Sequence, residues 1–140
     1  MKTEIEEIEL NKELQELYLK SKQWIAEIDF FQLDLEFLKK HIERNLSRLA
    51  DDKDFVCSSE SLRKITSTAK LQADLKVRII KYRGDLEPLI TQSNQVIDLS
   101  IIENYNQFEL ELANILFRLG EIKTLAFTLT GKSLNYRNSV

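Results

Sequence analysis

The chain has 140 residues, a net charge of −3 and 31% charged residues, a composition typical of a folded domain and not of a disordered or strongly basic protein. This balance excludes a global electrostatic footprint for nucleic acid, so we expect no nucleic-acid partner. The single cysteine, Cys57, excludes an intrachain disulfide. With no signal peptide and no long apolar run, the sequence predicts a cytoplasmic protein without membrane insertion.

Three glycines and one proline leave little turn chemistry, which favours an all-α fold with few connections. The first predicted helix covers residues 14–49 and contains neither proline nor glycine. Its residues form a heptad repeat, which is typical of a helix that packs along one seam. The seam positions are Leu14, Leu17, Ser21, Trp24, Ile28, Phe31, Leu35, Leu38, Ile42, Asn45 and Leu49.

The same helix carries a second apolar stripe, formed by Phe30, Leu33 and Phe37, on the side away from the seam. A helix packed on one side only is expected to be polar there, because large apolar side chains are unfavourable in water. We therefore expect another surface to cover this stripe.

A polar connection is predicted at residues 50–60, where Ser58 or Ser59 would cap the next helix. The second helix is predicted at residues 61–95. Gly84 and Pro88 interrupt it, and because the apolar pattern continues on both sides we expect a kink. The alternative is a separate helix at residues 86–97 and a four-helix bundle. The predicted seam is Leu62, Ile65, Ala69, Leu75, Ile79, Tyr82, Leu86, Leu89 and Val96.

The last helix is predicted to begin at Ser100, which has capping-box spacing to Glu103, and to end near Thr130, with Gly131 at the C′ position. This helix has more apolar residues than a single seam accounts for. The seam is Ile101, Tyr105, Phe108, Leu112, Ile115, Leu119, Ile122, Ala126 and Leu129, and the apolar residues off the seam are Leu110, Phe117 and Phe127. Together the three helices predict an elongated antiparallel bundle forming one domain at residues 1–131, followed by a flexible polar tail at 132–140.

The sequence offers no convincing catalytic or metal site. His41 is the only histidine, and a zinc site built on His41 and Cys57 would need two further strong ligands. No glycine-rich phosphate loop is present. We therefore expect no cofactor, no metal and no catalytic residue.

The function that the sequence favours is a non-catalytic bundle that acts through protein–protein contacts, with itself as a homodimer or with another helical protein. The expected interaction surface comprises Phe30, Leu33, Phe37, Leu110 and Phe117. One alternative is an enzyme or ligand binder with polar core groups drawn from Ser21, Gln32, Asn45, Gln72, Ser93 and Asn114. Another is a weak binder of anionic surfaces through the basic face of the second helix, Arg63, Lys64, Lys70, Lys76, Arg78, Lys81 and Arg83.

Overall fold

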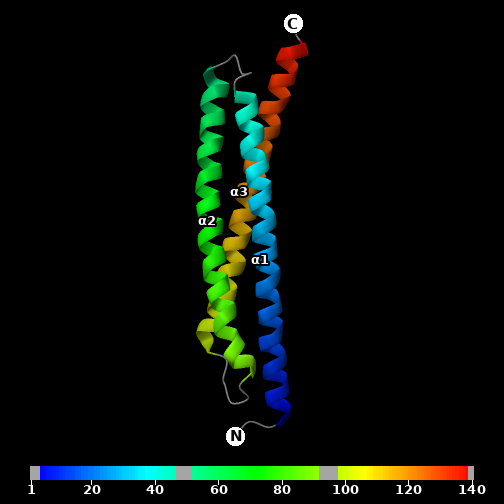
Figure 1. The fold of residues 1–140 in the computed structure, drawn as a ribbon, viewed down its shortest axis with the longest axis vertical. Helices are drawn as coiled ribbons and strands as arrows, with labels where there is room; N and C mark the ends of the chain where they lie inside the picture. The colour runs from blue at the N-terminus through cyan, green and yellow to red at the C-terminus, as the bar shows by residue number, and fades with distance from the viewer. Residues whose placement is uncertain (1–3, 47–51, 92–97, 139–140) are drawn as a thin grey trace. The chain divides into compact units, whose positions relative to one another are not determined.

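The computed structural model describes the backbone of residues 4–46, 52–91 and 98–138, and the side chains of 12–45, 56, 58–91 and 98–128. These residues form three long helices, α1 (Glu4–Leu46), α2 (Asp52–Thr91) and α3 (Leu99–Asn138), shown in Figure 1. The described ranges contain no strand. The prediction of an all-α bundle of three long helices is therefore confirmed.

α2 differs from its prediction at its N-terminal end. It begins at Asp52, so Ser58 lies inside the helix, where it is buried, and neither Ser58 nor Ser59 caps it. α2 then passes through Gly84 and Pro88 as one helix to Thr91. Residues 86–91 therefore do not open a fourth helix, while residues 92–97 lie outside the described ranges. The predicted kink stays a prediction.

The N-terminus of α3 is capped by Asp98 and not by Ser100. The Ser100 N–H donates to Asp98 Oδ1 at 3.4 Å, and the Ile101 N–H donates to the Asp98 carbonyl at 3.0 Å. The aspartate oxygen thus satisfies one of the free N–H groups of the first turn, and the predicted capping box of Ser100 and Glu103 is wrong.

The C-terminal end of α3 also differs from the prediction, because the helix continues past Gly131 to Asn138. A glycine inside a helix costs only about 1 kcal/mol relative to alanine, which does not by itself end a helix. The single domain at residues 1–131 and the flexibility of the tail stay predictions.

By its contacts the chain divides into two compact units, each built from parts of all three helices. Unit 1 comprises Met1–Asp29 and Ala73–Ala113, and unit 2 comprises Phe30–Gln72 and Asn114–Val140.

The core of unit 1 is centred on aromatic rings. Trp24 of α1 packs against Tyr105 and Phe108 of α3, with ring centroids 5.0 and 5.8 Å apart, and Phe108 meets Tyr82 of α2 edge-on at 5.2 Å. The Tyr82 hydroxyl donates to the Ile101 carbonyl at 3.0 Å. Aliphatic residues fill the rest of this core: Leu14, Ile28, Leu75, Ile79, Leu86 and Leu112.

Polar contacts fix the direction of α1 against α2 within unit 1. Tyr18 contacts Glu87 at 3.2 Å, whereas Asp29, further along α1, pairs with Lys76, which lies earlier on α2, at 2.6 Å. Residue numbers therefore increase along α1 in the direction in which they decrease along α2. The two helices are antiparallel in this unit, as Figure 1 also shows.

Unit 2 has an aliphatic core cluster from all three helices, comprising Leu35, Leu38, Ile42, Ile65, Leu119, Ile122 and Ala126, with Phe31 and Leu62 packed against it. Asp34 of α1 forms an ion pair with Lys123 of α3 at 3.1 Å. Unit 2 also has buried polar residues at Asn45, Ser58, Ser61, Thr68 and Gln72.

The α1 seam is confirmed wherever its side chains are described, with eight positions buried and Leu17 and Phe31 partly buried. The α2 seam is different from the prediction in its first half, because Ala69 is exposed and Leu62 only partly buried. The buried positions are Ser58, Ser61, Ile65, Thr68, Gln72, Leu75, Ile79, Tyr82 and Leu86, which alternate in steps of three and four.

Candidate functional site

The five residues predicted to form an interaction surface are all exposed. Phe30, Leu33 and Phe37 are 61%, 64% and 65% exposed on one face of α1 in unit 2. The Phe37 ring also stacks on the His41 ring, with centroids 6.0 Å apart and an interplanar angle of 11°. These three residues are called the α1 stripe below.

The other two predicted residues are not shown to join the α1 stripe. Leu110 belongs to unit 1 and Phe117 to unit 2, and both lie on α3 with 67% and 69% of their surface exposed. Phe117 lines a groove whose other lining residues come from α2 and α3. The structure therefore supports one continuous stripe of three residues, while a single surface of all five stays a prediction.

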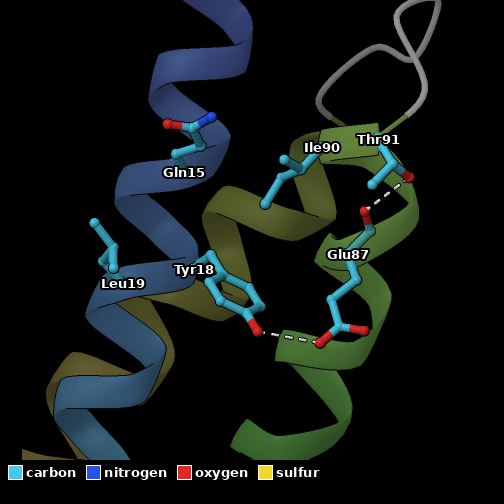
Figure 2. Close-up of a pocket in the computed structure, with 6 residues that line it drawn as sticks. All are labelled: Gln15, Tyr18, Leu19, Glu87, Ile90 and Thr91. Atoms are coloured by element: carbon cyan, nitrogen blue, oxygen red, sulfur yellow. Dashed lines mark hydrogen bonds between the residues drawn. The ribbon is translucent and has the colours of Figure 1, made fainter.

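Unit 1 contains an apolar groove of about 420 Å³ between α1 and α2, drawn in Figure 2. The Tyr18 hydroxyl donates to Glu87 Oε1 at 3.2 Å across this groove, and the ammonium of Lys22 lies 5.0 Å from the Tyr18 ring centroid. The one carboxylate of the lining, Glu87, and the ammonium of Lys22 both lie near Tyr18, so the groove has no clear charge preference. Its lining residues are Gln15, Tyr18, Leu19, Glu87, Ile90 and Thr91.

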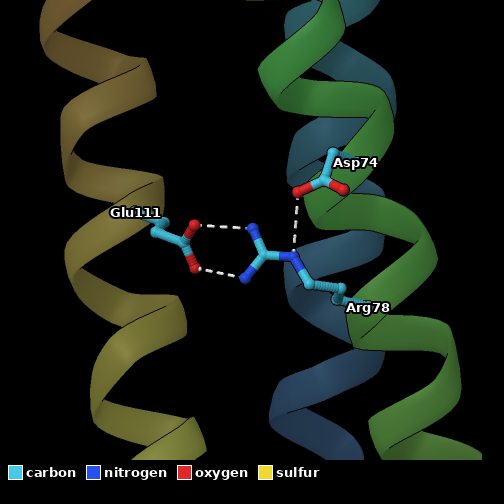
Figure 3. Close-up of polar contacts among 3 residues, drawn as sticks. All are labelled: Asp74, Arg78 and Glu111. Carbon is cyan, nitrogen blue, oxygen red and sulfur yellow. Dashed lines mark hydrogen bonds and ion pairs between the residues drawn. The ribbon is translucent and has the colours of Figure 1, made fainter.

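Arg78 is the centre of the main ionic contact between α2 and α3 in unit 1, as Figure 3 shows. Its Nη1 and Nη2 donate to the two carboxylate oxygens of Glu111 at 2.8 and 2.6 Å, and its Nε donates to Asp74 at 2.9 Å. The hydrogen bonds to Glu111 raise the pKa of Arg78, while its partial burial acts in the opposite direction. Each of the three guanidinium nitrogens donates one hydrogen bond to a carboxylate, so this arginine joins two helices and its charge is neutralised by protein groups.

The polar groups proposed for a core ligand site differ in burial and bonding where the structure describes them. Ser21 donates to the Tyr18 carbonyl at 2.6 Å and Asn45 to the His41 carbonyl at 2.8 Å, so each is satisfied within α1. Gln72 is buried, whereas Gln32 and Asn114 are exposed. Ser93 lies outside the described residues.

Sequence reasoning missed the buried Ser61 and Thr68. A strict alternation of three- and four-residue steps, extended backwards from Leu75 and Ile79, would have found both, because helix geometry decides which positions face inward.

Two kinds of feature are not found among the described residues. Their side chains contain no group of three or more histidine, cysteine, aspartate or glutamate residues placed to hold a metal ion. The Cys57 side chain is not among them, so a pairing with His41 stays outside the description. Over the same residues, no helix has the length and hydrophobicity needed to cross a bilayer.

Comparison of the chain with family models, with curated proteins and with solved structures finds no match.

Proposed function

We propose that this protein is a non-catalytic helical bundle that acts through protein–protein contacts and associates with a second copy of itself. The observation that carries this proposal is the α1 stripe, in which Phe30, Leu33 and Phe37 are each more than 60% exposed on one helix face. Large apolar side chains grouped on one face mark interaction surfaces, whereas isolated ones need no explanation. The single cysteine supports a reducing compartment such as the cytoplasm.

The charges along α1 favour a second copy as the partner. Glu27 precedes the stripe, whereas Lys39, Lys40 and Arg44 follow it and outnumber the one carboxylate among them, Glu43. Asp29 also precedes the stripe but pairs with Lys76 of α2. Two antiparallel copies related by a two-fold axis beside Leu33 would therefore place acidic ends against basic ends.

This pairing has a specific register. With the axis between positions 33 and 34, Phe30 of one copy lies opposite Phe37 of the other. The same axis places Glu27 opposite Lys40. A parallel pairing would instead place Lys40 against its own counterpart, which is unfavourable.

The first experiment measures the mass of the protein in solution by light scattering at micromolar concentrations. We expect a dimer, and we expect Leu33→Asp to shift the protein to the monomer, because a carboxylate would be desolvated at the centre of the interface. Val77→Asp is the matched control, since Val77 is 67% exposed on α2 and outside the stripe. A wild-type monomer at every concentration would refute self-association and leave another helical protein as the partner.

The second experiment tests the antiparallel register. Lys40→Glu should weaken dimerisation by about threefold to fivefold, the range for an exposed ion pair, and Glu27→Lys added to it should restore the wild-type value. A double variant weaker than either single variant would exclude the antiparallel arrangement while leaving self-association itself in place.

A further inference from the structure

Within unit 2, α2 and α3 form a groove of about 330 Å³. Its lining is more polar than that of the groove beside Tyr18 and Glu87 in unit 1. Its basic groups come from both helices, Lys64 from α2 and Arg118 from α3. Its lining residues are Lys64, Thr68, Asn114, Phe117, Arg118, Glu121 and Ile122.

The cations of this groove differ from the other cations that lie between helices. Lys76 pairs with Asp29, Arg78 with Glu111 and Lys123 with Asp34. Among the described residues, neither Lys64 nor Arg118 forms an ion pair. Two basic groups from facing helices thus line one groove together with a single carboxylate, that of Glu121, and no ion pair joins it to either of them.

The lining also offers hydrogen-bond donors. Thr68 is 1% exposed and lines the groove, and its hydroxyl can donate a hydrogen bond. The exposed amide of Asn114 adds a further donor at the groove.

We propose that this groove binds a small oxyanion group, a phosphate or a carboxylate, between Lys64 and Arg118, with Thr68 and Asn114 as hydrogen-bond donors. A guanidinium and an ammonium suit such a group because both are donors only and both are positively charged. Glu121 lies in the same lining and opposes an anion, so it sets the affinity lower than the two cations alone would give. The site contains no residue of the α1 stripe, on which the proposed dimer rests, and it shares only Phe117 with the larger interaction surface predicted from the sequence.

The test is a titration of the ¹⁵N-labelled protein with inorganic phosphate and, separately, with acetate, followed by amide chemical shifts. We expect saturable shifts at Thr68, Asn114 and Arg118. Lys64→Gln and Arg118→Gln should each weaken binding by about threefold or more, as expected for charge contacts near the surface. Glu121→Gln should strengthen binding by a similar factor, a gain that a misfolded variant does not produce.

Lys70→Gln is the matched control, because Lys70 is exposed on α2 in unit 2 and does not line the groove. This variant should bind as the wild type does. Shifts that do not saturate, or an equal loss for Lys70→Gln and Lys64→Gln, would show a diffuse charge effect and overturn the site. Weaker binding by Glu121→Gln would overturn it as well. A preference for phosphate or for acetate identifies which oxyanion the groove accepts.

Discussion

The two units bury the same face of α2 with opposite chemistry. In unit 1 the α2 seam consists of Leu75, Ile79, Tyr82 and Leu86. In unit 2 the seam is polar at four of its five buried positions, with the apolar exception at Ile65; the polar ones are Ser58, Ser61, Thr68 and Gln72. The helix repeat therefore decides which positions of α2 are buried, whatever the polarity of the side chains.

This contrast has an energetic consequence. The Gln72 amide is 2% exposed, and among the described residues neither its nitrogen nor its oxygen has a hydrogen-bond partner. Each such unsatisfied group costs about 1–3 kcal/mol, whereas the polar groups of unit 1 that enter the core, such as the Tyr82 hydroxyl, are bonded. We therefore expect the core of unit 1 to contribute more to the stability of the fold than the core of unit 2.

The largest effect is expected from Trp24 of unit 1. Trp24→Ala removes a side chain that is 2% exposed and in contact with two aromatic rings, so it should lower the free energy of unfolding by about 3–5 kcal/mol. Chemical denaturation followed by circular dichroism measures this loss. Trp24→Phe keeps an aromatic ring and should lose clearly less. Equal losses for both variants would mean that the ring contacts contribute little.

A change of opposite sign is expected in unit 2. Gln72→Leu replaces two unsatisfied polar groups by an apolar side chain of similar size, so it should raise the free energy of unfolding by about 1–3 kcal/mol. Denaturation of the variant and the wild type under the same conditions measures the gain. Gln32→Leu, at an exposed position of α1, is the control and should change little. A loss of stability in Gln72→Leu would show that the amide has a partner in solution and would remove the contrast between the units.

The third prediction concerns the buried hydroxyl of unit 1 at alkaline pH. Burial raises the pKa of Tyr82 to about 12 from its ordinary value of 10.0, with a smaller contribution from Tyr105. Below pH 10.0 the side chain is neutral in both states, so stability is unaffected. As the pH rises from 10.0 towards 12, the unfolded chain loses this proton first, so folding stability should fall.

Tyr82→Phe tests this dependence. At neutral pH it should lower the free energy of unfolding by about 1 kcal/mol, because the hydrogen bond to the Ile101 carbonyl is lost. Above pH 10.0 it should lose less stability than the wild type, which circular dichroism at a series of pH values measures. Parallel pH profiles for the two proteins would contradict the prediction. Tyr18→Phe, at a half-exposed position, is the control.

The buried face of a helix could be predicted from the sequence where its seam positions are mostly apolar. On α1 the periodic positions are mostly large and apolar, so the helix and its buried face were both predicted, including the polar positions Ser21 and Asn45. On the first half of α2 the apolar residues Leu62 and Ala69 lie beside the seam, and the polar seam residues Ser61 and Thr68 were passed over.

Helix ends were less predictable, because several residues compete for the same role. Asp98 and Ser100 are both good caps, and only the observed hydrogen bonds of Asp98 distinguish them. Similarly, Gly131 suits a helix end but does not require one, and α3 continues beyond it.

The sequence by itself determined the three helices, the buried face of α1 and the exposed α1 stripe, because helical periodicity is a local property that one segment displays alone. The packing of the helices against one another was needed to show which polar residues of α2 are buried and which cations form no ion pair. These features depend on what a second helix places opposite each side chain. The groove between Lys64 and Arg118 is of this kind, since its residues lie far apart in the sequence and meet only when α2 and α3 pack.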